Sequence, residues 1–172
     1  MTNQKEVIVR AQRLTPEAFA PYGKVVLRPT TPAPKTGSDW DCWFGVGLLP
    51  GSNLQLGQVI TRLTDYRVTT MEREPTEEFL LPITGPVVQT VARPGNLSDP
   101  TEEPDASMVV AFRIEPGEAI IMSPGTWHWA AMPVHGETFY YFATVPHPPE
   151  PGRDPTSPWV PFRDRAIVRV EL

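Results

Sequence analysis

The segment PGEAIIMSPGTWH, residues 116–128, contains the strand, turn and histidine from which the fold is inferred. Ala119 to Met122 is apolar enough to form a strand buried on both faces, and Pro124-Gly125 supplies the turn that ends it. His128 follows between two tryptophans at the start of the next apolar segment. We therefore expect the strand and its turn to deliver this histidine to the interior.

A second segment, EREPTEEFLLPITG at residues 72–85, brings carboxylates to where they would meet His128. Glu72 and Glu74 are two residues apart, so in a strand they share one face. Carboxylates inside an apolar barrel must be paired, neutralised or bound to a cation. The alternative is that residues 72–78 form a solvated acidic hairpin.

The two segments resemble the two motifs of the cupin superfamily in order and spacing. In the first motif, the Glu78–Gly85 interval matches, and Glu72 and Glu74 occupy positions usually held by histidines. In the second motif, Gly117, Gly125 and His128 match, and Ser123 replaces the proline. The resemblance implies an all-β cupin double-stranded β-helix, that is, a jelly-roll barrel.

Composition agrees with such a fold. The chain has 172 residues and 22 prolines, which favour short strands and many turns over long helices. We expect one domain over residues 1–172, with the barrel at about 39–145 and a proline-rich arm and final strand at 146–172. Thr15 as N-cap and Pro16 at the first helical position predict one short N-terminal helix, which packs Phe19 and Tyr22 onto the barrel.

Several strands are predicted from alternating or apolar runs. Residues 6–10 are expected as an opening edge strand, and the last strand is expected either against it or on a second subunit. Thr64-Asp65 and residues 84–86 are the predicted turns of two strand pairs. Residues 39–44 are expected to begin a strand or a lid, with their aromatic side chains in the core. The other predicted strands are 25–27, 54–63, 66–72, 79–83, 86–93, 107–114, 139–145 and 165–170.

Charge and cysteine content limit the partners. The formal net charge of -5 argues against binding to nucleic acid or to an anionic membrane surface and favours a small-molecule or protein partner. Cys42 is the only cysteine, so no intramolecular disulfide is possible. Residues 1–9 lack the apolar run of a signal peptide, so a cytoplasmic location is expected.

The acidic segment and the histidine together predict a metal site made of Glu72, Glu74, Glu78 and His128. Manganese, iron, nickel or magnesium suit such an oxygen-rich set better than structural zinc, although the ion, zinc included, stays open. His135 and His147 lie in a turn and in the arm, so a three-histidine site would need those loops to fold in. His128 is the best candidate for a general acid or base.

Residues 14–25, LTPEAFAPYGKV, resemble the opening signature of the ureidoglycolate lyase family. The likeness spans about residues 14–145, and its further matches are Arg62, Glu72-Arg73, Pro75, Leu81-Pro82, Val88 to Ala92, Ala111-Phe112 and Trp127-His128. It implies a metal-assisted carbon-nitrogen lyase of allantoin degradation, part of purine catabolism, that splits ureidoglycolate into urea and glyoxylate. It also implies a homodimer.

The resemblance further implies roles for particular side chains. Glu72 and His128 would be catalytic, and Arg62 would bind the substrate carboxylate, as a guanidinium does well. Glu74 is taken as a third catalytic side chain because it shares a strand face with Glu72. A surface salt bridge is the alternative for Arg62. Tyr140 and Tyr141 face opposite sides of a strand, and Tyr140 is taken, with Trp127, as a further substrate contact.

The chain also departs from that family. Glu74 stands where members typically have histidine, and Glu78 stands near a position where they tend to have glutamine. The substrate is therefore open. The first alternative is a cupin lyase or isomerase acting on another small hydroxy or keto acid. The second is a cupin module that binds a small molecule without catalysis.

Overall fold

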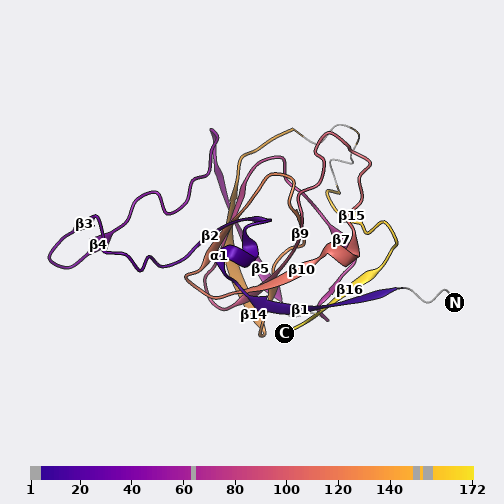
Figure 1. Ribbon diagram of the computed structural model, residues 1–172, viewed down its shortest axis with the longest axis horizontal. Helices are drawn as coiled ribbons and strands as arrows, with labels where there is room; N and C mark the ends of the chain where they lie inside the picture. The colour runs from indigo at the N-terminus through magenta and orange to yellow at the C-terminus, as the bar shows by residue number, and fades with distance from the viewer. Residues whose placement is uncertain (1–4, 63–64, 149–151, 153–156) are drawn as a thin grey trace.

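The computed structural model describes residues 5–62, 65–148, 152 and 157–172. Its regular structure is almost entirely strands, which form two curled sheets facing each other (Figure 1). The helical segments of the described residues are α1 (Pro16–Phe19) and a 3-10 turn, η1 (Ala106–Met108). No helix in this part of the chain has both the length and the apolar character needed to cross a membrane. The predicted all-β jelly-roll architecture with one short N-terminal helix is confirmed.

The strands divide between the sheets as follows. Along the first sheet the order is β12 (Trp127–His128), β9 (Val87–Ala92), β10 (Val110–Ile114), β1 (Glu6–Arg13), β16 (Ile167–Glu171) and β6 (Arg67–Val68), with β13 (Met132–Pro133) also paired to β9. Along the second sheet it is β2 (Gly23–Val26), β11 (Ala119–Met122), β8 (Glu78–Pro82), β14 (Glu137–Thr144) and β5 (Gln55–Arg62). Two small pairs are β7 (Thr70–Met71) with β15 (Val160–Pro161) and β3 (Lys35–Thr36) with β4 (Asp41–Cys42).

Two strand pairs expected from local turns are wrong. β8 and β9 lie in different sheets, and so do β5 and β6. In a jelly roll the chain crosses from one sheet to the other at many of its turns, and a turn signal does not reveal which partner the next strand finds. Leu63 and Thr64, at the expected turn before β6, lie outside the described residues.

The first strand is internal to its sheet, which corrects the expected edge position. β1 pairs in parallel with β10 on one side and with β16 on the other. The last strand thus closes the sheet against residues 6–10 of its own chain, with Glu6 opposite Ile167 and Arg10 opposite Glu171. The two sheets therefore draw on strands outside residues 39–145, the range expected for the barrel.

The helix serves as an anchor, as predicted. The Thr15 hydroxyl accepts a hydrogen bond from the Ala18 amide at 3.2 Å, and Pro16 begins the helix. The Phe19 ring packs against Phe112 and Tyr22, with ring centroids 5.2 and 5.9 Å apart. Because a single helical turn is unstable alone, this packing holds it in place.

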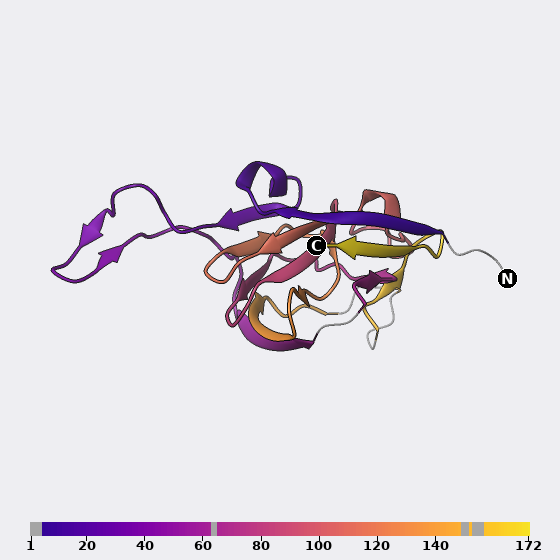
Figure 2. The same cartoon turned by 90° about the horizontal axis from the view of Figure 1, so that it is seen from below.

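A long excursion between β2 and β5 projects from the body and carries the β3–β4 pair at its tip (Figures 1 and 2). Trp40 and Phe44 on it are 54% and 67% exposed, so the expectation that they belong to the core is wrong. The expected strand at 39–44 is limited to Asp41–Cys42. The pair extends away from the barrel (Figure 2).

Candidate functional site

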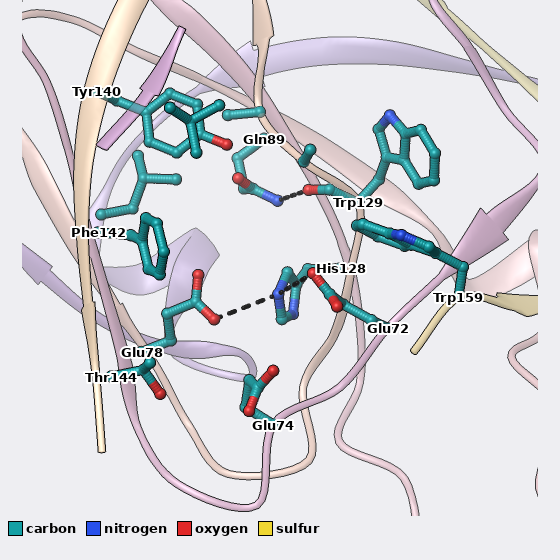
Figure 3. Close-up of a pocket in the computed structure, with 14 residues that line it drawn as sticks. Glu72, Glu74, Glu78, Gln89, His128, Trp129, Tyr140, Phe142, Thr144 and Trp159 are labelled. Carbon is teal, nitrogen blue, oxygen red and sulfur yellow. Dashed lines mark hydrogen bonds and ion pairs between the residues drawn. The ribbon is translucent and has the colours of Figure 1, made fainter. Parts of the chain in front are cut away.

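A cavity of about 320 Å³ lies between the two sheets (Figure 3). Its walls come from β5, β8, β9, β12 and β14, from the segment after β7, and from Trp159 near the C-terminus. A volume at the lower end of the usual range for ligand sites, roughly 300–1,000 Å³, suits a small molecule. The cavity is lined by a cluster of ionisable groups on one side and by apolar and aromatic side chains on the other.

His128 is held in the cavity wall from two directions. Its backbone amide donates to the Glu72 carbonyl and its carbonyl accepts from the Glu72 amide, both at 2.8 Å. Its Nδ1 lies 3.0 Å from the Thr126 carbonyl oxygen, which accepts the Nδ1 proton. The side chain is nearly fully buried, and Nε2 is left facing the cavity carboxylates. The predicted inward delivery of this histidine is confirmed.

Two carboxylates converge on that nitrogen. Glu78 Oε2 lies 3.5 Å and Glu72 Oε1 lies 3.8 Å from His128 Nε2 (Figure 3). Burial alone would lower the pKa of His128, but the charge and hydrogen bond of Glu78, with the charge of Glu72, raise it to about 9. At neutral pH the imidazole is therefore a cation.

Glu72 behaves differently from an ordinary glutamate. Burial raises the pKa of Glu72 to about 7, with Glu78 and Glu74 adding to the increase and the nearby His128 opposing it. A carboxyl group with this pKa is present in both protonation states near neutral pH. It is thus suited to take up and release a proton during a reaction.

The third glutamate is paired with a histidine from the chain beyond β14. The carboxylate of Glu74 lines the cavity and pairs with Nε2 of His147. Among the described residues, then, a second imidazole does fold in toward the acidic cluster. Its contact is with Glu74, whereas His128 contacts the other two carboxylates.

Tyr140 and Gln89 add neutral hydrogen-bonding groups to the wall. Tyr140 is buried on β14, and burial raises its pKa to about 12, although a hydrogen bond with the Ala131 backbone lowers it. The phenol is therefore protonated throughout the neutral range. The Gln89 amide nitrogen donates to the carbonyls of Trp129 at 2.6 Å and Thr90 at 3.1 Å, which fixes its orientation.

One wall is aromatic and is completed by the C-terminal segment. The rings of Trp129 and Trp159 lie 4.5 Å apart between centroids, inclined at 55°. β15, which follows Trp159 directly, pairs with β7, next to Glu72. The described part of the proline-rich arm thus supplies a side chain to the cavity. Residues 149–151 and 153–156 of the predicted arm lie outside the described residues.

The structure brings Glu72, Glu74, Glu78, His128 and Tyr140 together at this cavity, as the sequence predicted. It does not bring two other predicted site residues there. Arg62 is exposed on β5 and pairs with Glu137 at 2.9 Å, which is the surface salt bridge considered as its alternative.

Trp127 is the other predicted contact that lies elsewhere. It is buried in the core, and its ring lies 4.7 Å from the Arg73 guanidinium carbon. Successive strand residues point to opposite faces, so His128 faces the cavity and Trp127 faces away from it.

Sequence reasoning did not identify several cavity residues. They are Val59, Leu80, Gln89, Trp129, Ala130, Ala131, Phe142, Thr144 and Trp159. Phe142 could have been found, because it is two residues from Tyr140 on the same strand and so faces the same side. Trp159 had no local signal, since the pairing of β15 with β7 joins segments about ninety residues apart.

The predicted metal site needs an arrangement that these residues do not show. An imidazole with two or three carboxylates is a chemically suitable donor set for a divalent ion. Nevertheless, the described residues contain no group of three or more His, Cys, Asp or Glu side chains placed to hold one. The imidazole instead forms ion pairs with the carboxylates. Metal binding stays a prediction.

Comparisons with known proteins do not identify the chain. No family model matches it, and no curated protein matches its sequence, so the likeness to ureidoglycolate lyases has no support from these comparisons.

Partial structural likeness is found to several solved structures. A 4-keto-6-deoxy sugar epimerase from Streptomyces spheroides overlaps with a TM-score of 0.40 at 12% identity, covering 55% of this chain and 47% of that one. RmlC from Streptococcus suis overlaps with a TM-score of 0.41 at 15% identity, covering 69% of this chain and 61% of that one. A TDP-quinovose 3,4-ketoisomerase from Campylobacter jejuni overlaps with a TM-score of 0.41 at 7% identity, covering 64% of this chain and 71% of that one. The chain thus spans about half the length of the first of these. No activity is transferred from overlaps of this extent.

Proposed function

We propose that the protein is a lyase or isomerase that moves protons on a small hydroxy or keto compound bound in the cavity. The observation that carries this proposal is the convergence of Glu72 and Glu78 on His128 Nε2, within 3.8 and 3.5 Å, in the wall of a largely apolar cavity. Such an arrangement supplies a base, a cation and a neutral donor within reach of one bound molecule.

The roles follow from the charge states. Ionised Glu72 removes a proton from a carbon next to a substrate carbonyl, and the carbonyl oxygen gains negative charge. The His128 imidazolium, held in its cationic state by Glu78, and the Tyr140 hydroxyl are the donors that stabilise this oxygen. If the substrate hydroxyl proton passes to the former carbonyl oxygen and the carbon proton returns to the former carbonyl carbon, an isomer with a new carbonyl forms. If a leaving group takes up a proton and departs from the carbon on the other side of the deprotonated carbon, a lyase product with a new double bond forms. His128 would then act as an electrophile rather than as the general base.

Proton removal precedes both outcomes, so it is the best quantity to measure. The purified protein is incubated in deuterated water with hydroxy ketones, hydroxy aldehydes, amino ketones, keto acids and ureidoglycolate, and exchange of carbon-bound hydrogen is followed by NMR. Urea and glyoxylate release are measured in parallel, since a C–N bond cleavage needs the same acid and base groups. These reactions are run with a chelator and again with added nickel, manganese, iron or zinc.

Catalysed exchange or cleavage of at least one compound, lost in His128→Asn, is the expected result. Release of glyoxylate from ureidoglycolate would identify the lyase predicted from sequence. Saturable binding of a panel compound with no exchange and no cleavage under any condition would overturn the proposal in favour of a small-molecule-binding module.

A further inference from the structure

The charge of the cavity is unbalanced. Three carboxylates line it, from Glu72, Glu74 and Glu78, and His128 is the single basic side chain among the described lining residues. Arginine and lysine are absent from that lining, and Arg62, predicted to hold a substrate carboxylate, is exposed on β5 and paired with Glu137. Even when His147, which pairs with Glu74, is counted as a cation, acidic groups outnumber basic ones.

Apolar side chains around the carboxylates strengthen their electrostatic effect on a bound ligand. Val59, Leu80 and Phe142 contribute apolar surface, so the charges act through a medium less polarisable than water. An anionic substrate would have to leave water and face carboxylates there. A cation of the same size would be attracted to them.

The aromatic wall favours the same ligands. Trp129 and Trp159 form a tilted pair with centroids 4.5 Å apart, directly at the cavity. The negative faces of indole rings attract ammonium groups, and tryptophan does so more strongly than tyrosine or phenylalanine. This attraction is independent of the carboxylates, and the two indoles lie on the same side of the cavity as Glu72 in Figure 3.

We infer that the cavity selects small organic cations, amines that carry a hydroxyl or carbonyl group, over carboxylates of equal size. The inference rests on the proposed function for the hydroxyl or carbonyl part of the ligand, and on the lining charges and indoles for the ammonium part. It differs from the expectation of a carboxylate substrate that the sequence resemblance implied.

A matched set of probes tests the inference by binding alone. The probes are 2-amino-1-phenylethanol, 1-phenyl-1,2-ethanediol and mandelate, which share a phenyl ring and a hydroxyl group and carry charges of +1, 0 and -1. Binding is followed at pH 8, with chelator present, by the tryptophan fluorescence that Trp129 and Trp159 contribute. The amine should bind at least about tenfold more tightly than mandelate, since one unit charge near a carboxylate is worth that much even at high effective dielectric constant.

Variants then assign the preference to the cavity. Glu72→Gln should reduce the ratio of amine to mandelate affinity several-fold. Glu17→Gln removes an exposed carboxylate from the helix and should leave the ratio unchanged. Mandelate binding as tight as the amine, no saturable binding of the amine, or saturable binding of added nickel or manganese alone would each overturn the inference.

Failure of the inference is distinguishable from failure of the proposed function. Turnover of a keto acid without preference for the amine would refute the inference and support the proposed function. Preference for the amine, without exchange on any compound of the panel, would support the inference about charge and refute the proposed function.

Discussion

Glu72 and His128 are connected through both backbone and side chain. Their amides and carbonyls exchange two hydrogen bonds of 2.8 Å, and Glu72 Oε1 lies 3.8 Å from His128 Nε2. The backbone pairing fixes how far apart the two side chains begin, so their separation does not depend on a flexible loop. Glu78 approaches the same nitrogen from β8 in the facing sheet.

The first prediction concerns how Glu78 sets the charge of His128. Glu78→Gln should lower the pKa of His128, because Glu78 contributes both a charge and a hydrogen bond that raise it to about 9. The fall can be followed by NMR titration of the imidazole. Glu74→Gln is the matched control, because Glu74 pairs with His147 instead. Equal effects of the two substitutions would contradict the arrangement described here.

The second prediction concerns catalysis by the imidazole. His128→Asn should reduce the proposed exchange or cleavage by about 10² to 10⁴-fold, since asparagine cannot carry the positive charge or transfer a proton. Circular dichroism should show an unchanged strand content, which separates lost chemistry from lost folding. His135→Asn serves as the control, because His135 is exposed in a turn outside the cavity. An active His128→Asn protein would remove His128 from the mechanism.

Much of the fold could be predicted from local sequence. β11 is buried along its whole length, as its run of four apolar residues indicated, and Thr15 and Pro16 marked the helix. The pairing of strands could not be read in this way. β1 lies between β10 and β16, which begin about 100 and 160 residues later, and no local pattern encodes such contacts.

The candidate site likewise contains residues that local sequence predicts and residues that it does not. Its titratable residues were predictable, because carboxylates buried among apolar strands must be paired with a cationic group, and a histidine can supply one. The surface position of Arg62 was not predictable, because successive side chains along β5 alternate between two faces and the sequence does not show which face borders the cavity. Trp159 and His147 reach the site through the long-range return of the chain after β14, for which the sequence carried no local signal.

The third prediction tests the role of the C-terminal segment in the cavity. Trp159→Ala should weaken binding of the amine probe and lower the free energy of unfolding by about 1 kcal/mol, since aromatic pairs contribute roughly 0.5–1.5 kcal/mol beyond their buried area. Trp40→Ala, on the projecting excursion and 54% exposed, is the control and should change neither quantity by more than a few tenths of a kcal/mol. Chemical unfolding and fluorescence titration give both values. If Trp40→Ala weakens probe binding as much as Trp159→Ala, the aromatic wall is not where the probe binds.

The fourth prediction is a loss of stability with rising pH. The native state holds the Glu72 proton to a pKa of about 7, whereas the unfolded chain releases it near 4.5. Between pH 4.5 and about 7 the native state binds more protons than the unfolded chain, so the free energy of unfolding falls as pH rises. At 1.36 kcal/mol per pKa unit the fall is about 3 kcal/mol, as an upper figure for a group that is 19% exposed. His128 acts in the same direction at higher pH, because its stabilisation is complete below 6.5 and is lost through about 9.

Glu72→Gln isolates the lower part of this dependence, because glutamine does not titrate. Urea unfolding at pH 5, 6 and 7 should give a falling free energy for the parent protein and a flatter curve for the variant. Above pH 7 both proteins should lose stability as His128 releases its proton. Glu17→Gln, an exposed position on α1, should follow the parent at every pH. Parallel curves for Glu72→Gln and the parent between pH 5 and 7 would mean that Glu72 titrates as an ordinary glutamate, and its role as the base near neutral pH would have to be abandoned.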